Sequence, residues 1–295
     1  MKNYLNLLRP KHWAKNLFLY IPVFFAGLAL NIETLIKVTE GFICFCLVAS
    51  SIYIINDYRD IGDDKQHPVK SKRAIASGAV NKYWALLISI LLLSVGLTWA
   101  FFIRDKFFFV MSIYFLLNLA YSLGLKKIAI LDILIIAIGF VLRVKAGAVI
   151  ARVGLSEWLT IMVFLLALFL AIAKRRDDVL IKIHSGNEMR QSIKGYNLDF
   201  INVALSLICA VMVVSYFMYT VSIEVMERLG TYRLYYTCLF VIAGILRYLQ
   251  IVFVNSDSES PVKILYKDRF IQVTILLWVI SFYMILYMKD LTIFK

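Results

Sequence analysis

Three aspartates and an asparagine stand where an apolar run of the sequence meets a charged one. Asn56, Asp57, Asp60 and Asp64 follow directly on the run GFICFCLVASSIYII and spell N-D-x-x-D-x-x-x-D. In a helix the three aspartates are spaced i, i+3 and i+7 and share one face, where like charges repel one another. Hard cations such as Mg²⁺ take carboxylate and phosphate oxygens. The pattern therefore predicts a Mg²⁺–diphosphate site, and the alternative is a solvated helix end.

Basic side chains follow the aspartates within the same loop. Guanidinium groups suit phosphate by bidentate donation, and ammonium groups suit it as point charges. The alternative for each residue is that it only fixes the topology of a membrane protein. The predicted phosphate ligands of this loop are Lys65, Lys70, Lys72 and Arg73. His67 and His12 are interpreted as loop residues rather than as catalysts.

The elements that must position these groups are membrane-spanning helices. The 295-residue chain is 62% hydrophobic and 17% charged, whereas a soluble domain is typically about 45–50% apolar and about 25% charged. Apolar runs of roughly 20 residues cross about 30 Å of hydrocarbon, and along them only helices satisfy the backbone. We predict an all-α integral membrane protein with nine transmembrane helices around a central cavity. The expected spans are 13–31, 36–55, 83–103, 107–123, 128–151, 157–173, 200–222, 234–254 and 271–288.

The net charge of +13 is explained by topology rather than by a nucleic-acid partner. Most Lys and Arg residues fall in the segments on the same side of the membrane as the N-terminus. This bias predicts a cytoplasmic N-terminus and an external C-terminus. The four cysteines fall inside apolar spans without metal-type spacing, so we assign them no function.

Two long, charged loops lie on the predicted cytoplasmic side. They cover residues 56–82 and 174–199 and follow the second and the sixth expected span. We interpret residues 1–295 as a single polytopic membrane domain with weak four-helix repeats, in which these loops form the active site. Membrane proteins built from repeats often place their site between the halves.

The aspartate motif, the nine spans and the loop positions resemble the UbiA superfamily of intramembrane prenyltransferases. Further stretches, from Arg9 to about Tyr196, resemble its decaprenyl-phosphate phosphoribosyltransferase branch. The last three spans match this branch only as apolar spans, without specific motifs. These stretches are LLRPKHWAKNLFLYIP, DDKQHPVKSKRAIASG, YSLGLKKIAILDI, FVLRVKAGA, and IAKRRDDV followed by RQSIKGYN.

The resemblance implies transfer from 5-phosphoribosyl diphosphate to a polyprenyl phosphate in the inner leaflet, with release of diphosphate. It implies that Mg²⁺ holds the diphosphate through Asn56, Asp57, Asp60 and Asp64, the three aspartates being the catalytic residues. The acceptor phosphate is already anionic, so the reaction needs no strong general base, in keeping with only three histidines.

The second charged loop departs from the superfamily pattern. Classical prenyltransferases carry D-x-x-x-D after the sixth span, whereas this sequence has KRRDD, and neither Asp177 nor Asp178 is followed by an acid four residues on. The departure is consistent with the phosphoribosyl branch and puts a second metal held by this loop in doubt. We assign Lys174 and Arg175 to phosphate binding and Asp178 to metal or ribose hydroxyls. The alternative is a basic stop after a span.

Three further residues are implied by the resemblance as contacts of the donor. Tyr121 and Lys126 lie in YSLGLK at the end of the fourth expected span, and Tyr196 ends the second loop. Interfacial anchoring and topology are the alternatives for the first two. Arg190 and Tyr196, both in the second loop, are weaker candidates than Lys174 and Arg175.

One face of the fifth expected span carries charged and small residues. Asp132, Gly139, Arg143 and Gly147 are separated by steps of 7, 4 and 4, which keep them on one side of a helix. Ionisable groups in a bilayer normally face the bundle interior. Asp132 lies near the cytoplasmic edge, where it can reach the donor. Arg143 lies about 16 Å deeper, where a structural or cavity-lining role is as well supported as catalysis.

The segment before the first span is basic. Arg9, Lys11, Lys15 and Asn16, with Trp13 among them, suit a lipid-borne phosphate that enters from the inner leaflet. The alternative is ordinary attraction to headgroups with a tryptophan anchor.

Two other functions are open on the sequence. An aromatic prenyltransferase of quinone biosynthesis would use a prenyl diphosphate as its donor, but the altered second motif and the extra basic residues argue against it. An anionic lipid transporter would place ionisable groups near the midplane between broken helices, whereas here they gather at one surface. The leading hypothesis is the phosphoribosyltransferase in the cytoplasmic membrane.

Overall fold

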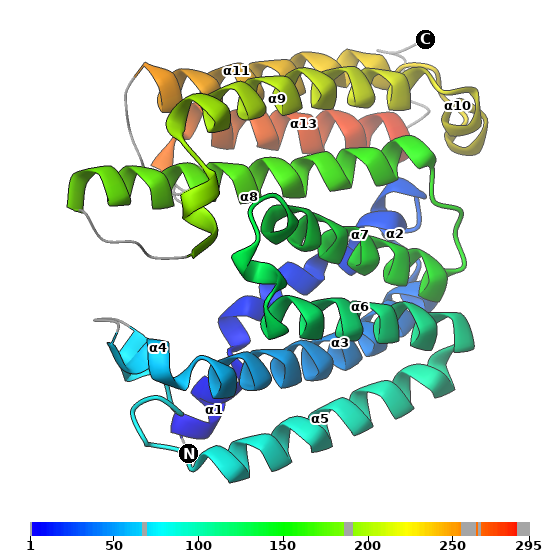
Figure 1. The fold of residues 1–295 in the computed structure, drawn as a ribbon. Coiled ribbons are helices and arrows are strands. Elements are labelled where there is room, and N and C mark those ends of the chain that lie inside the picture. The colour runs from blue at the N-terminus through cyan, green and yellow to red at the C-terminus, as the bar shows by residue number, and fades with distance from the viewer. Residues whose placement is uncertain (1, 67–69, 186–190, 255–263, 265–266, 288–295) are drawn as a thin grey trace. The chain divides into compact units, whose positions relative to one another are not determined.

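The computed structural model describes residues 2–66, 70–185, 191–254, 264 and 267–287, and this part of the chain is helical and contains no β-strand (Figure 1). Among the described residues, eight helices are long and apolar enough to cross a membrane. They are α3 (Ile32–Arg59), α5 (Lys82–Ile103), α6 (Asp105–Leu123), α7 (Leu131–Ala151), α8 (Glu157–Ser185), α9 (Leu198–Val221), α11 (Cys238–Phe253) with the 3₁₀ turn η5 (Leu234–Thr237) before it, and α13 (Arg269–Tyr287). The prediction of an all-α, multi-pass membrane protein is confirmed.

The first expected span, residues 13–31, is not one α-helix. After α1 (Lys2–Leu8), the chain forms the 3₁₀ helix η1 (Pro10–Tyr20) and then the short α2 (Ile21–Phe25). Pro22 has no backbone N–H, and its ring would collide with the carbonyl four residues earlier in a continuous α-helix. At rises of about 2.0 and 1.5 Å per residue, η1 and α2 together extend about 30 Å. The nine-span count and the sides of the two termini stay predictions.

Asparagine side chains begin three of the spans. Asn31 accepts a hydrogen bond from the backbone N–H of Thr34 at the start of α3. Asn81 and Asn197 cap α5 and α9 in the same way. Such a cap satisfies one of the N–H groups that the first helical turn leaves without a partner. The capping residues explain why these spans begin where they do.

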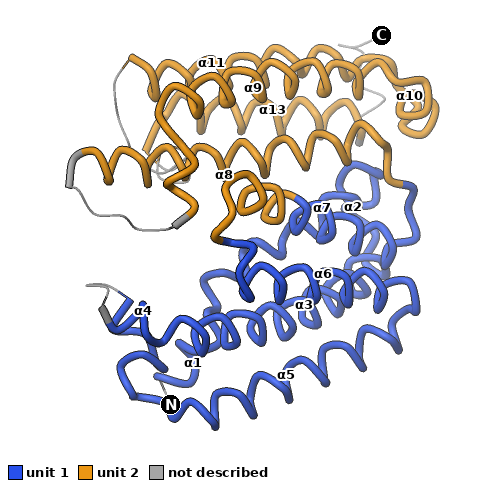
Figure 2. The backbone as a smooth tube through the Cα atoms, in the orientation of Figure 1, with its two compact units in different colours: residues 1–126, 138–154 blue, residues 127–137, 155–295 orange. Residues whose placement is uncertain are grey.

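The chain divides into two compact units, coloured separately in Figure 2. Unit 1 comprises residues 1–126 and 138–154, with α3, α5, α6 and most of α7. Unit 2 comprises residues 127–137 and 155–295, with the start of α7 and with α8, α9, α11 and α13. The predicted relation of the two halves as weak repeats stays a prediction.

In unit 1, α3 is the central helix and packs against α1, α5, α6 and η1. Its core gathers Phe45 and Val48 of α3 with Phe107 and Met111 of α6. Gly147 of α7 lies so close to the backbone carbonyl of Leu19 that any side chain there would collide with η1. The N-terminal segment is therefore held tightly within unit 1.

In unit 2, α8 packs against α9, and α11 packs against both α9 and α13. Their shared core also takes in Ile193 and Tyr196 from the segment that follows α8. The short turn η4 (Gln191–Gly195) brings these two residues into place. A part of the predicted loop 174–199 is thus folded against the helices: its first residues extend α8 to Ser185, and its last ones enter the core.

Candidate active site

The predicted aspartate motif lies at the end of α3 and in the short helix α4 (Ile61–Gln66) that follows. Asn56 and Asp57 belong to the last turn of α3, and Asp60 ends that helix with its backbone outside the regular α region. Asp64 lies in α4. The break after Arg59 has a consequence that a continuous helix would not have: the three carboxylates form two groups rather than one row.

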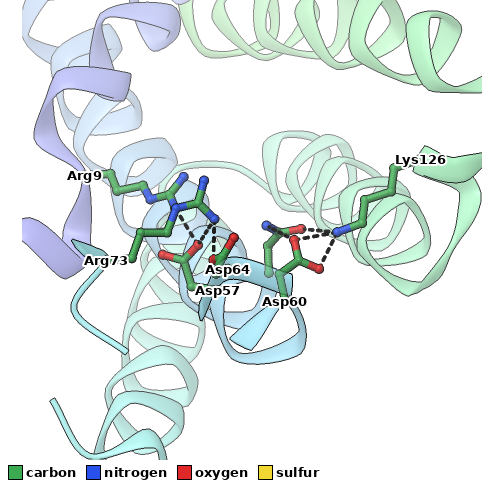
Figure 3. A network of polar contacts seen from close by, with 7 residues as sticks. Arg9, Asp57, Asp60, Asp64, Arg73 and Lys126 are labelled. Atoms are coloured by element: carbon green, nitrogen blue, oxygen red, sulfur yellow. Dashed lines mark hydrogen bonds and ion pairs between the residues drawn. The ribbon is translucent and has the colours of Figure 1, made fainter. Parts of the chain in front are cut away.

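Two arginines hold the first group of carboxylates together. Arg73 Nη1 donates to Asp57 Oδ1 at 3.1 Å and to Asp64 Oδ2 at 2.7 Å. Arg9 Nη2 donates to the same oxygen of Asp57. Figure 3 shows both guanidinium groups directed at this pair of carboxylates. The side chains of Asp57 and Asp64 are only 6% and 3% exposed, so the arginines compensate charges that would be costly to bury alone.

A lysine holds the second group. Lys126 Nζ donates to Asp60 Oδ1 and Oδ2 at 2.6 and 2.7 Å and to Asn56 Oδ1 at 3.1 Å. Asn56 Nδ2 in turn donates to Asp60 at 3.0 Å. Figure 3 places Asp60 and Lys126 beside the arginine-bound pair, with the lysine reaching in from another segment of unit 1. Together, three carboxylates and three cations form what we call the unit 1 cluster.

The N-terminal segment is fixed to α3 at the level of this cluster. Arg9 begins η1 with a left-handed backbone at φ 52°, and its guanidinium lies 5.2 Å from the ring centroid of Tyr53. Ser50 donates to the carbonyl of Leu8 at 2.8 Å. Sequence reasoning missed Tyr53, although its position four residues before Asp57 puts both on one face of α3.

The donor set of the unit 1 cluster fits Mg²⁺ by its chemistry. All of its acidic and amide ligands offer oxygen, and Mg²⁺ is usually bound through one or two carboxylates together with phosphate oxygens and water. In the part of the chain that the structure describes, no group of three or more His, Cys, Asp or Glu side chains gathers around one point that could hold a metal. Phosphate oxygens and water would complete the ligands of Mg²⁺ at this site, as they usually do in proteins.

A second polar cluster lies in unit 2. Arg175 of α8 donates from Nε to Asp132 Oδ2 at 2.7 Å and from Nη1 to Asp178 Oδ2 at 3.0 Å. The hydroxyl of Tyr196 donates to Asp132 Oδ1 at 2.7 Å. All four side chains are buried. We call Asp132, Arg175, Asp178 and Tyr196 the unit 2 cluster.

Tyr196 also supports an unusual backbone conformation. The N–H of Ile130 donates to the Tyr196 hydroxyl at 2.6 Å, and Ile130 has a φ of 71°. A left-handed backbone at a non-glycine residue typically costs about 1–3 kcal/mol and persists only where its surroundings impose it. Burial, together with the hydrogen bond to Asp132, raises the pKa of Tyr196 above its ordinary value. The phenol therefore stays protonated and can donate.

The remaining predicted phosphate ligands differ in exposure. Lys70 and Tyr121 are partly buried. His67 and Arg190 lie outside the described residues. The exposed residues of the set are Lys11, Lys15, Lys65, Lys72 and Lys174. These five lysines meet the first requirement of a ligand for a phosphate that arrives from water or from a lipid surface.

Asn16, predicted to contact a lipid phosphate, lies instead in the core of unit 1. Its side chain accepts a hydrogen bond from Arg143 Nε at 2.9 Å and donates to Cys46 Sγ at 3.3 Å. Arg143 also donates to Tyr114 and to the carbonyl of Gly139. The guanidinium of Arg143 thus finds neutral oxygen partners within the membrane, which favours the structural role among those expected for it.

A bundle of membrane-spanning helices with carboxylates and cations gathered at a helix end defines a multi-pass membrane protein suited to bind a polyanion there. The model of the UbiA prenyltransferase family matches residues 19–274, and the chain belongs to this family. The resemblance to the UbiA family that the sequence motifs indicated is confirmed.

Two relatives of this chain carry the same, more specific name. The chain is 33% identical over 284 residues to a decaprenyl-phosphate phosphoribosyltransferase of Mycolicibacterium smegmatis, covering 92% of this chain and 88% of the relative. It is 31% identical over 289 residues to a protein of the same name from Corynebacterium glutamicum, covering 96% of this chain and 86% of the relative. Both matches extend over nearly the full length of either protein.

A solved structure shares the fold. The structure of a UbiA homolog from Archaeoglobus fulgidus bound to DMAPP and Mg²⁺ superposes with a TM-score of 0.70 at 22% sequence identity. The match covers 96% of this chain and 99% of that one. The helical architecture of this chain is therefore that of known UbiA homologues.

Proposed function

We propose that this protein is a transferase that moves the 5-phosphoribosyl group from phosphoribosyl diphosphate to a polyprenyl phosphate and releases diphosphate. The observation that carries the proposal is the near full-length relationship to two proteins named decaprenyl-phosphate phosphoribosyltransferase. The unit 1 cluster supplies the chemistry that a diphosphate leaving group requires. The reaction depends on Mg²⁺, in keeping with the Mg²⁺-bound homologue.

The unit 1 cluster binds the diphosphate of the donor in this proposal. Arg9, Arg73 and Lys126 are the cations that turn from carboxylates to phosphate oxygens, which they bind with charge-assisted hydrogen bonds. The carboxylates they release, with Asn56 beside them, would hold Mg²⁺. When bound, Mg²⁺ supplies positive charge to the diphosphate as negative charge builds on it.

The transfer itself needs no proton to be removed. A phosphate oxygen of the acceptor forms a bond to C1 of the ribose while the bond from C1 to the diphosphate oxygen breaks, and the electron pair of that bond leaves with the diphosphate. Positive charge develops on the ribose carbon, so water must be kept from it. The apolar helices around the cluster serve this purpose by limiting the access of water.

The exposed basic residues divide between the two substrates. Lys11 and Lys15 of η1, next to Arg9, bind the phosphate of the lipid acceptor at the inner leaflet of the cytoplasmic membrane. Lys65, Lys70, Lys72 and Lys174, with Tyr121, bind the donor.

The unit 2 cluster has a different role, because Arg175 is engaged by Asp132 and Asp178. Arg175 positions these two carboxylates, and the remaining lone pairs of Asp178 suit ribose hydroxyls or a metal. Lys174, which is exposed beside it, is the better phosphate ligand of the KRRDD segment.

A second candidate function is prenyl transfer to an aromatic acceptor. It is favoured by the family name and by the DMAPP in the homologous structure. Both functions use a diphosphate leaving group, so the unit 1 cluster serves either one. The two differ in which part of the donor passes to the acceptor.

The test is a transfer assay with the purified full chain in detergent. Phosphoribosyl diphosphate labelled in the ribose is incubated with a polyprenyl phosphate and Mg²⁺, and label is measured in the organic extract. A parallel reaction contains labelled prenyl diphosphate and an aromatic acceptor. We expect ribose label in the lipid fraction only with both substrates and Mg²⁺. Ribose label that stays in the aqueous phase, with prenyl label in the aromatic product, would establish the second candidate instead.

A further inference from the structure

The residues just before α7 have a backbone that this sequence does not favour. Ile130 is β-branched, yet its φ is 71°, a region in which such a residue is an outlier. Its carbonyl accepts hydrogen bonds from the N–H groups of Ile133 and Leu134, as a residue at the start of a helix does. Local sequence therefore does not account for the conformation, and a contact from elsewhere must maintain it.

That contact comes from Tyr196, which lies 66 residues further along the chain. Its hydroxyl accepts from the N–H of Ile130 at 2.6 Å and donates to Asp132 at 2.7 Å. The hydroxyl thus accepts one hydrogen bond and donates another to two residues of the same turn, Ile130 and Asp132. We call the Ile130 N–H, the Tyr196 hydroxyl and the Asp132 carboxylate the Tyr196 bridge.

The packing around Tyr196 leaves it little freedom. Tyr196 is 8% exposed, and Ile193 in the turn before it is 1% exposed within the core of unit 2. A Cβ at Gly195 would lie 2.5 Å from Cβ of Ala129, so only glycine lets the two segments approach this closely. The phenol is therefore presented to Ile130 by a rigid support.

We propose that Tyr196 is a positioning residue, which acts on the reaction by fixing the backbone at Ile130 and the carboxylate of Asp132 rather than by touching the donor. The inference rests on the proposed function for its kinetic readout. The chain links the Tyr196 bridge to the active site, because Lys126 precedes Ile130 by only four residues and donates to Asp60 and Asn56. We expect a change of the backbone at Ile130 to alter the position of Lys126 through this short connection.

This role distinguishes Tyr196 from the donor contact that sequence resemblance implies. A residue that binds the donor contributes mainly to KM, and its loss is not repaired by a change of the backbone elsewhere. A residue that maintains a strained backbone becomes less necessary once the strain is removed. Glycine adopts a positive φ about as readily as a negative one, so Ile130→Gly removes the strain.

The kinetic test is a double-mutant cycle. Tyr196→Phe, which keeps the ring and removes the hydroxyl, is expected to lower kcat/KM about tenfold, a change that corresponds to about 1.4 kcal/mol. Ile130→Gly in the Tyr196→Phe background is expected to restore at least about half of that loss on a logarithmic scale. Tyr248→Phe is the matched control, since Tyr248 is a buried tyrosine of the same core outside the bridge, and it should keep wild-type kinetics.

A structural test does not depend on activity. Amide hydrogen exchange of the peptide that contains Ile130 should be at least about tenfold faster in Tyr196→Phe than in the wild-type protein or in Tyr248→Phe. Unchanged exchange would overturn the proposal, and so would a double variant no more active than Tyr196→Phe alone with a raised KM for the donor. If the wild-type protein transfers no phosphoribosyl group, the proposed function fails, while hydrogen exchange still decides on the bridge.

Discussion

The two polar clusters contain the same kinds of groups but differ in how far water reaches their cations. In the unit 1 cluster the side chains of Arg9, Arg73 and Lys126 are 17%, 26% and 21% exposed, whereas Arg175 in unit 2 is 1% exposed. A partly exposed cation can exchange a carboxylate for a phosphate and stay paired throughout. A buried guanidinium between two carboxylates cannot leave without uncompensated charge behind it.

This difference in exposure indicates that one cluster binds ligand and the other stabilises the structure. The unit 1 cluster is suited to exchange partners when an anion arrives, and the unit 2 cluster is suited to hold segments in fixed positions. Four variants test this division, in order of decreasing expected effect.

The largest effect is expected at Arg175. Arg175→Gln leaves Asp132 and Asp178 buried without their cation, and breaking a buried pair in this way typically costs about 3–5 kcal/mol of stability. The midpoint of thermal unfolding in detergent measures it.

The control for Arg175 also removes the charge of Asp132, one of its two carboxylate partners. Asp132→Asn combined with Arg175→Gln should be more stable than Arg175→Gln alone, because no unpaired charge then remains at Asp132. Equal midpoints for the single and the double variant would show that the buried pair does not support the fold.

The next effect is expected at Asp57. Asp57→Asn keeps the shape of the side chain but removes the charge that Arg9 and Arg73 share, and with it a ligand for the metal. Loss of charge stabilisation at a reacting centre typically lowers the rate about 100-fold to 1,000-fold. We expect a loss of this size in kcat/KM with an unchanged unfolding midpoint. Asp63→Asn is the matched control, since Asp63 is an exposed aspartate in the next helix, α4, and it should stay near wild-type activity.

A smaller effect is expected at Arg73. Arg73→Lys keeps the charge but replaces the planar guanidinium, whose Nη1 donates to both Asp57 and Asp64, by a shorter side chain with a compact ammonium group. A lost charge-assisted hydrogen bond is typically worth about 1.5–3 kcal/mol, so kcat/KM should fall at least about tenfold. Arg59→Lys, at an exposed position at the end of α3, should have no such effect. A fully active Arg73→Lys enzyme would remove Arg73 from the donor site.

The smallest effect is expected outside both clusters. Arg247 donates to Asp268 before α13, and this hydrogen bond lowers the pKa of Asp268 from its ordinary value of 3.8. The pair therefore stabilises the fold at neutral pH, and the contribution disappears as the pH falls through the lowered pKa. Arg247→Gln should keep full activity and lower the unfolding midpoint slightly at pH 7. A deficit that persists unchanged at the lowest pH would contradict this origin.

The positions of most of the long helices could be predicted from the sequence, although α3 and α8 extend beyond the spans expected for them. The spans expected at 83–103 and 107–123 are α5 (Lys82–Ile103) and α6 (Asp105–Leu123). Transfer from water to hydrocarbon is a local and roughly additive property of consecutive residues, so hydropathy locates such helices. The segment 13–31 differs because its one proline, Pro22, changes the local helix geometry, which hydropathy does not register.

The sequence did not predict in the same way which cation pairs with which carboxylate in the clusters. The sequence predicted a Mg²⁺ site at Asp57, Asp60 and Asp64. It did not predict that Arg73 would join two of these carboxylates or that Lys126 would bind the third. These pairings depend on where distant segments meet in space. The conformation of Ile130 has no local signal either, because it is imposed by Tyr196 from a different part of unit 2.

The central claim is that the unit 1 cluster holds the diphosphate of the donor together with Mg²⁺. Calorimetric titration of the purified protein with phosphoribosyl diphosphate, with and without Mg²⁺, tests it most directly. The account predicts binding that requires Mg²⁺ in the wild-type protein and in Asp63→Asn, and that is lost in Asp57→Asn. Binding of equal strength without Mg²⁺, or undiminished binding by Asp57→Asn, would contradict it.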